Sequence, residues 1–532
     1  MLGQAQGAGA HGQRSARTTI RDAVLGRKQD ALRRAVAWAI VSLIFCRFVL
    51  SSLSSREQWI AFVPDDAYYY LGFGRGFAST GHWTLDGGVS CSSGFHLLQA
   101  YLAAACWAAC HRISADAPVR ALLLLSSVFN ALSALVCLRF LTRLFGPWAS
   151  LAVLLVFTSK NALICGMSGM EWSLAVLSLA LAAELALSSN SGAKHRNAHG
   201  VVLGLFAVIS RSDNLLWVFV AIGAGLLTLG WRHSYRLAAL GCGALLGSFV
   251  IALHSYVITG SWIQDSVLAK LHWGAHRGLD LANSLNTFGM ATGVSFLGKG
   301  IDCFVLVGLV LWGVFRAYFE SGARRAALLL ASFTIVAALV SGAGNSGGLQ
   351  YWYTAAVVLP CCILWASLIA PICALRLGVR GAPLIGVLAS LSANIASARL
   401  GPWQNQPALL HAALRLQTED WSAWRVGAWN AGILAYYRGH DVINLDGLAN
   451  HDALIASQRG KLREYLADTR VRYIVDFAAM VERREYRERG GYGQPGQTLP
   501  LLQVACAPAN DPRWADTPLE YWRVERDEAE SD

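Results

Sequence analysis

Long apolar runs separated by short polar loops are the feature that most limits what this chain can fold into. The runs lie near 35–53, 119–138, 148–165, 170–188, 200–211, 214–230, 237–257, 298–315, 325–341, 351–372 and 382–398. A bilayer core needs about 20 apolar residues per helix. Only 14% of the residues are charged, against about 25% in a soluble domain. This composition excludes a soluble enzyme, a disordered chain and a nucleic-acid-binding domain, and predicts a polytopic membrane protein.

A further apolar run at 94–110 decides the predicted topology. If this short run lies in the interface or re-enters, every basic loop falls on one side of the membrane, and the positive-inside rule makes that side cytoplasmic. The sequence therefore predicts a multi-pass inner-membrane protein with about 11 spans, a cytoplasmic N-terminus and an external C-terminal tail. The basic loops carry Arg139 and Arg143, Lys194 and Arg196, Arg232 and Arg236, Arg316, Arg324 and Arg325, and Arg376 and Arg380.

Charge and pattern divide the chain into three predicted parts. Residues 1–34 form a basic cytoplasmic arm, 35–398 the transmembrane domain with a first external loop at 54–93, and 399–532 an external domain. In that last part DVINLDG and VRYIVDF predict strands, GKLREYLADTR a helix, and WSAWRVGAWNAGILAYY a helix leading into a strand. The alternation predicts a small α/β domain. The net charge of +11 fits basic cytoplasmic loops and an arm at the inner leaflet.

Two adjacent carboxylates follow the first span. Asp65 and Asp66 come directly after Pro64 and precede three tyrosines. Carboxylates beside apolar surface have raised pKa values, and such a group can act as a general base or, in a pair, hold a divalent cation such as Mg²⁺ or Mn²⁺. The alternative is that they only cap a helix starting after the proline. His96 ends the following Gly/Ser-rich loop and could donate to a phosphate or a sugar hydroxyl, or simply anchor a helix at the headgroups.

Three further charges sit in or beside apolar runs, and a fourth, Lys270, lies in the long predicted external loop. Glu171 opens a predicted span, as a ligand-binding carboxylate or as a cap. Arg211 and Asp213 interrupt the apolar stretch around them, and a charge at the membrane centre costs about 2.5–3.5 kcal/mol, so such charges pair or line a cavity. Their alternative is a structural ion pair at a loop tip. Lys270 could hold a phosphate or be an ordinary solvated lysine.

Two aromatic residues, Tyr351 and Trp352, open another predicted span. They could stack on a sugar ring, or belong to an interfacial aromatic belt, which is common in membrane proteins. In the predicted topology the polar motifs all fall on the external face, in the segments 54–93, 166–170, 211–213, 258–297 and 342–350.

These motifs together resemble a known group of enzymes. The segment PDDAYYYLGFGRGFASTGHWTLDGGVSCSSGFHLLQAYL resembles the first external loop of GT-C glycosyltransferases, and GMEWSL, SRSDNLL, the Ser266/Lys270 segment, YWY and VINLDGLAN resemble other segments of bacterial members. The mycobacterial cell-wall arabinofuranosyltransferases belong to the same broad class. Two departures are visible. SSGFHLLQ lacks a proline and a tryptophan of the bacterial pattern, and GFGRG keeps only its arginine.

The resemblance implies a GT-C-like bundle that moves a sugar, with inversion, from a polyprenyl-phosphate donor to a cell-envelope glycan or lipid acceptor at the periplasmic face. By carry-over, Asp65 or Asp66 would be the catalytic base, and the other acid would orient the acceptor or bind a metal. Arg75, Arg211 and Lys270 would neutralise the phosphate. Membrane lipid is an expected partner and nucleic acid is not.

Two other hypotheses remain open. A transporter or flippase for a lipid-linked sugar would use the same cationic cavity without chemistry. Transporters often carry paired broken helices, and the chain shows no second copy of the break at 200–230, which disfavours this hypothesis. An assembly subunit with a degenerate site is the third hypothesis, and the retained acidic pair and cations disfavour it. The sequence does not identify the sugar or the acceptor.

Overall fold

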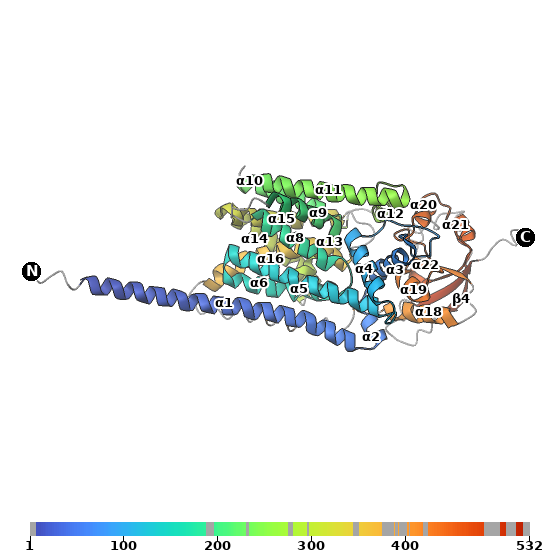
Figure 1. Ribbon diagram of the computed structural model, residues 1–532, viewed down its shortest axis with the longest axis horizontal. Coiled ribbons are helices and arrows are strands. Elements are labelled where there is room, and N and C mark those ends of the chain that lie inside the picture. Colours follow the sequence, from blue (N-terminus) through green and yellow to red (C-terminus); the bar gives the residue numbers. More distant parts are fainter. Residues whose placement is uncertain are drawn as a thin grey trace, which may run out of the picture.

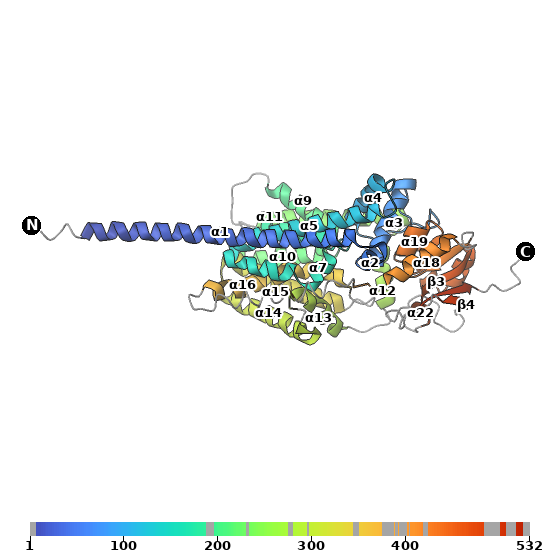
Figure 2. The ribbon, with the colours of Figure 1, turned by 90° about the horizontal axis from the view of Figure 1, so that it is seen from below.

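A helical bundle makes up most of the molecule, and a small domain with a β-sheet lies at one end of it (Figure 1). In this computed structural model, helix α1 (Gly7–Leu53) runs along the bundle and projects beyond its opposite end in both views (Figures 1 and 2). The structure describes residues 7–187, 196–229, 234–274, 280–294, 297–343, 350–374, 388, 392, 402–403, 405–418, 424–482, 499, 501–506 and 518–524.

Six helices in the described part of the chain are long and apolar enough to cross a membrane. Each coincides with a predicted apolar run, which confirms a multi-pass membrane protein. They are α1 from Gln29 onward, α5 (Ala117–Phe145), α11 (Ser234–Thr259), α14 (Lys299–Phe319), α15 (Gly322–Ala343) and α16 (Ala355–Ala374), the last extended by a 3₁₀ turn, η5 (Tyr351–Thr354).

Shorter apolar helices complete the described part of the bundle. They are α4 (Leu97–Cys110), η1 (Pro147–Ala149) with α6 (Ser150–Phe157), α7 (Lys160–Cys165), α8 (Trp172–Leu187), α9 (Arg196–Ser210) and α10 (Asn214–Leu229). With 14 residues, α4 rises about 21 Å, less than the ~30 Å hydrocarbon core. The run predicted at 382–398 lies almost entirely outside the described residues, so the total of about 11 spans stays a prediction.

Small residues allow the bundle's helices to pack closely. A Cβ on Gly204 of α9 would lie 2.1 Å from the carbonyl oxygen of Leu240 on α11, and one on Gly243 would lie 2.0 Å from that of Val201. Each helix therefore presents a glycine to the backbone of the other, which lets α9 and α11 approach closely, as small residues do between membrane helices.

Short helices lie at the end of the bundle beside the sheet. They are α2 (Arg56–Ile60), α3 (Asp65–Thr80), α12 (Asp265–Gly274), α13 (Leu281–Gly289) and η3 (Met290–Thr292). The first two belong to the predicted first external loop, and α12 lies in the long predicted loop after α11. Helices α2, α3 and α12, which belong to segments predicted on the external face, thus lie next to the C-terminal domain (Figure 1).

The C-terminal domain contains a five-stranded sheet of order β2-β1-β3-β5-β4. Strand β1 is parallel to β2 and β3, with Val426 opposite Val442, and β5 is antiparallel to β3 and β4. The strands are β1 (Arg425–Ala428), β2 (Val442–Asn444), β3 (Val471–Phe477), β4 (Leu501–Cys506) and β5 (Leu519–Val524). The helices are α18 (Gln406–Thr418), α19 (Gly432–Arg438), α20 (His451–Gln458), α21 (Leu462–Asp468) and α22 (Ala478–Glu482).

The α/β prediction for this domain holds for β2, α21 and β3, but one detail was wrong. In WSAWRVGAWNAGILAYY the strand comes first and the helix second. The carboxylate of Asp476 on β3 accepts the backbone N–H groups of Trp429 at 2.7 Å and Asn430 at 2.9 Å. These bonds replace ladder bonds just after β1, so the strand ends and α19 can begin.

The domain is fastened to the bundle through contacts between α3 and α19. The ring of Tyr68 lies 5.5 Å from that of Tyr436 and 5.8 Å from that of Tyr437. Arg75 donates to the carbonyl oxygens of Ala435 at 3.2 Å and Tyr436 at 3.1 Å. One continuous apolar core includes residues of both parts. The position of α3 is therefore set jointly by the bundle and by the C-terminal domain.

Candidate active site

A cavity lies where the end of the bundle meets the C-terminal domain, with about 600 Å³ of open space including its mouth. Its walls come from α3, the loop before α4, the turns before α8 and α10, α12, η5 and the turn at 448–449 of the C-terminal domain. Six of the ten residues singled out from the sequence line it: Asp66, His96, Glu171, Arg211, Lys270 and Trp352.

The two adjacent carboxylates have different surroundings. Asp65 is buried, and its oxygens accept the backbone N–H groups of Gly432 at 3.0 Å and Ile433 at 2.7 Å, at the start of α19. Burial raises the pKa of Asp65 to about 7. Asp66 lines the cavity. Neighbouring residues of a helix point about 100° apart. Asp65 of α3 therefore faces the start of α19, and Asp66 faces the cavity.

A buried ion pair forms another wall. Arg211 pairs with Glu171, and these side chains are 3% and 1% exposed. The guanidinium also holds Asp213 through two bonds of 2.7 and 2.9 Å, and the hydroxyl of Tyr70 donates to Glu171 at 2.9 Å. The break between α9 and α10 thus places a fully compensated arginine at the cavity, as a charge removed from water requires.

Two cations approach one aromatic ring. The guanidinium carbon of Arg211 lies 5.0 Å, and Nζ of Lys270 4.9 Å, from the centre of the Tyr353 ring. Such contacts are worth about 0.5–2 kcal/mol each. Lys270 shares its face of α12 with Ser266, four residues earlier, and both line the cavity. The Tyr353 ring therefore lies beside both Lys270 and the paired Arg211 at this wall of the cavity.

His96 is neutral in this site. Burial lowers its pKa to about 4. Its Nδ1 lies 3.5 Å from the backbone N–H of Ser212, and its Nε2 lies 3.6 Å from Oε1 of Glu171. Nδ1 can therefore act as the acceptor, which leaves the proton on Nε2 toward Glu171 and the cavity.

Four of the predicted residues do not line the cavity. Asp65 caps α19, and Arg75 contacts the last carbonyls of that helix, with the Trp107 ring 6.0 Å from its guanidinium carbon. Asp213 is held by the guanidinium of Arg211, which does line the cavity. The Tyr351 ring packs 6.4 Å from that of Trp403, outside the lining.

Several residues that line the cavity were not predicted from the sequence. Tyr353 is the last residue of the YWY motif, of which only Tyr351 and Trp352 were predicted as site residues. Tyr69 lines the cavity and joins three segments. Its hydroxyl donates to the carbonyl of Trp429 and accepts from the backbone of Ala431, both at 2.9 Å, and Asn444 lies 3.1 Å away. Leu448 and Ala449 carry no sequence signal for a site.

The described residues contain no group of three or more His, Cys, Asp or Glu side chains arranged to hold a metal ion. The acidic pair in particular cannot act as two ligands from one side, because Asp65 is engaged by the backbone of α19. Asp66 and Glu171 are the carboxylates of the lining, and Glu171 is held by Arg211 and Tyr70. The acidic pair therefore does not fit a metal site.

Comparisons with known proteins agree with this architecture. Residues 401–516 match the model of a domain of unknown function, DUF8728, and no curated protein matches. The structure is similar to that of an archaeal oligosaccharyltransferase from Archaeoglobus fulgidus crystallised with Zn and sulfate, with a TM-score of 0.50 and 14% identity over 84% of this chain and 68% of that one. The bundle has a GT-C-like fold. The oligosaccharyltransferase AglB from Archaeoglobus fulgidus, in complex with an inhibitory peptide and a dolichol-phosphate, gives a TM-score of 0.50 and 10% identity over 93% and 75% of the two chains.

Proposed function

We propose that this protein is an inverting glycosyltransferase that moves a sugar from a polyprenyl-phosphate donor to a glycan or lipid acceptor at the periplasmic face. The observation that carries the proposal is the cavity itself, in which the Asp66 carboxylate shares the walls with Lys270 and with Arg211, which is paired with Glu171. A general base together with cationic groups for a leaving phosphate is what transfer from a sugar phosphate needs.

Each side chain has a distinct proposed role. Asp66 takes the proton of the acceptor hydroxyl as that oxygen attacks the anomeric carbon, and the bond from this carbon to the phosphate oxygen breaks. Lys270 stabilises the charge that develops on the departing phosphate. Arg211, held by two carboxylates, fixes the wall behind Lys270 through Tyr353. Neutral His96 offers its Nε2–H to a sugar hydroxyl or a phosphate oxygen.

Two of the earlier assignments change in this proposal. Arg75 fastens α19 to α3, so we assign it to docking of the C-terminal domain and not to the donor phosphate. Asp65 contributes to the same docking, because it accepts the first backbone N–H groups of α19. Trp352 remains a candidate for contact with the sugar ring, and the turn at 448–449 places the C-terminal domain beside the acceptor.

A complementation experiment tests the proposal. A deletion strain of the source organism receives the wild-type gene, Lys270→Gln or the matched control Lys461→Gln, which removes a cation whose side chain is 59% exposed. Surface glycans and lipids are then compared by mass spectrometry at equal protein levels. We expect the deletion to lose one sugar, the control to restore it, and Lys270→Gln to restore less than about a tenth of it. Full restoration of the sugar by Lys270→Gln would refute the proposed role of Lys270 in binding the phosphate.

A further inference from the structure

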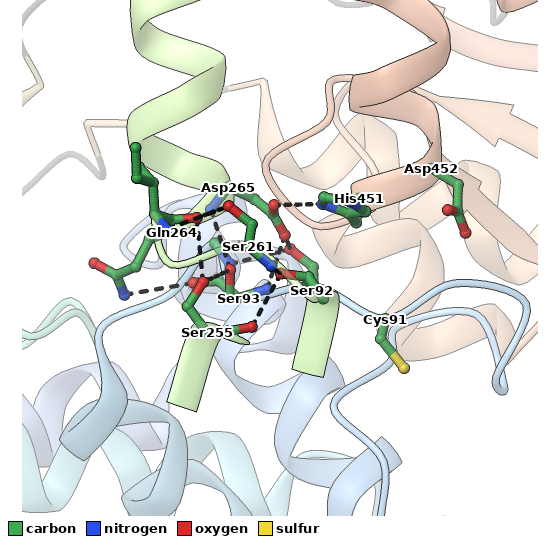
Figure 3. Close-up of polar contacts among 12 residues, drawn as sticks. Cys91, Ser92, Ser93, Ser255, Ser261, Gln264, Asp265, His451 and Asp452 are labelled. Carbon is green, nitrogen blue, oxygen red and sulfur yellow. Dashed lines mark hydrogen bonds and ion pairs between the residues drawn. The ribbon is translucent and has the colours of Figure 1, made fainter. Parts of the chain in front are cut away.

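A buried carboxylate outside the cavity connects helix α12, the first loop and helix α20. Asp265 is the first residue of α12 and is fully buried. One of its oxygens accepts from the hydroxyl of Ser92 and the backbone N–H of Ser93, both at 2.9 Å, and the other lies 2.7 Å from Nδ1 of His451 (Figure 3). A carboxylate oxygen only accepts, so the histidine carries its proton on Nδ1.

The same cluster fixes the start of α12 to the first loop. The hydroxyl of Ser93 accepts from the backbone N–H of Asp265 at 3.1 Å and from the hydroxyl of Ser255 at 2.9 Å. The side chain of Gln264 donates to the carbonyl of Phe95 at 2.9 Å. Figure 3 shows the Asp265 carboxylate between this loop and His451 on α20.

The groups that face His451 come from three elements. Asp265 lies on α12, Asp452 is its neighbour on α20, and Cys91 of the first loop accepts the backbone N–H of His451 at 3.1 Å. The hydrogen bond to Asp265 is the main cause that raises the pKa of His451 above its usual 6.5. Asp265 and His451 thus form a part-buried pair whose hydrogen bond favours the protonated imidazole.

We propose that Asp265 and His451 are positioning residues that hold α12 so that Lys270 and Ser266 face the cavity, and that donor binding therefore depends on the protonation of His451. The proposal rests on the function proposed above. The connection is short, because Ser266 follows Asp265 and Lys270 lies one turn further along the same helix. Ala269 and Trp273 of α12 also pack with Leu454 of α20 in one buried apolar cluster, which joins the two helices.

The direction of the pH dependence follows from linkage. The pKa of His451 is higher in the assembled site than in a disengaged state, so the pair stabilises the assembled site fully below about pH 6.5. This stabilisation is lost as the pH rises through the raised pKa. Binding of a phosphate ligand at Lys270 should therefore weaken from pH 6 to pH 8.5.

The test measures binding of farnesyl phosphate to the full-length protein in nanodiscs at both pH values. His451→Asn is the matched variant, because its side-chain amide can donate to Asp265 without titrating. His451→Phe removes the donor and leaves the carboxylate oxygen unpaired. The ionisation of the ligand itself is the same in every comparison, so the ratio between variant and wild type isolates the pair.

We expect the Kd of the wild type, relative to His451→Asn, to rise about tenfold between the two pH values, the scale of one charge-assisted hydrogen bond. His451→Phe should bind about tenfold more weakly at pH 6 with little further change. An equal pH dependence in wild type and His451→Asn would overturn the positioning role, even where His451→Phe fails to fold. Unchanged binding in Lys270→Gln would instead overturn the proposed function.

Discussion

Removing one member of the Arg211–Glu171 pair should destabilise the protein strongly. Both side chains are almost completely buried, at 3% and 1% exposure. Arg211→Gln would leave the Glu171 carboxylate with Tyr70 as its main hydrogen-bond donor. Breaking a buried pair by removing one partner costs about 3–5 kcal/mol, because an uncompensated charge remains. Glu171→Gln should cost less unfolding free energy, because Asp213 still pairs with the Arg211 guanidinium.

A double-mutant cycle supplies the measurement. Unfolding free energies in mixed micelles, read by tryptophan fluorescence during an SDS titration, are compared for the single variants and for Arg211→Gln with Glu171→Gln. The two amides can bond to each other, so the double variant should recover at least about 2 kcal/mol of the summed losses. Asp213→Asn is the control, since its side chain is 49% exposed, and should cost about 1 kcal/mol or less. A loss below about 1 kcal/mol in Arg211→Gln, or strictly additive losses, would refute the reasoning.

Three further predictions concern the first loop and the ring between the cations. Gly94→Ala should loosen the C-terminal domain, because its Cβ would lie 1.7 Å from the carbonyl oxygen of Leu448; faster proteolysis of the tail at unchanged membrane insertion is the readout, and an unchanged rate would contradict it. The pKa of Asp65 is raised by burial from 3.8 to about 7, so unfolding free energy should fall as the pH rises through this interval. Asp65→Asn should remove that fall and Asp66→Asn should retain it. The reverse pattern would show that Asp66, and not Asp65, has the raised pKa. Tyr353→Leu should weaken farnesyl phosphate binding about threefold to tenfold while Tyr353→Phe should not; equal binding by both would exclude the ring as a support for the cations.

The apolar runs predicted the long helices, and two strand patterns of the tail predicted β2 and β3, since both follow from the period of side chains along one segment. Strands β4 and β5 were not predicted. The number of spans was harder to predict, because short helices such as α4 and α6 do not reach the length of a bilayer core by themselves. The reversed order of β1 and α19 depends on Asp476, a side chain 46 residues beyond Asn430, and no local pattern contains that contact.

The candidate site shows the same limit. His96, Glu171 and Arg211 could be chosen from the sequence because each is a polar group beside an apolar run. Lys270 could be chosen because Ser266, four residues earlier, would share its face of a helix. The choice between Asp65 and Asp66 could not be made, since it depends on α19, 367 residues away along the chain. Arg75 was chosen by resemblance, and its helix face directs it to α19. Asp265 and His451, 186 residues apart, had no sequence signal that linked them.

We propose Asp66, and not Asp65, as the base of a glycosyl transfer in this cavity. The most direct measurement compares Asp66→Asn and Asp65→Asn in the deletion strain, by mass spectrometry of surface glycans and lipids normalised to the amount of each protein. The account predicts that Asp66→Asn reproduces the loss of one sugar seen in the deletion, while Asp65→Asn retains transfer per molecule. If Asp66→Asn restores the wild-type glycan, the carboxylate is not the base, and a transporter of a lipid-linked sugar becomes the better account of the cavity.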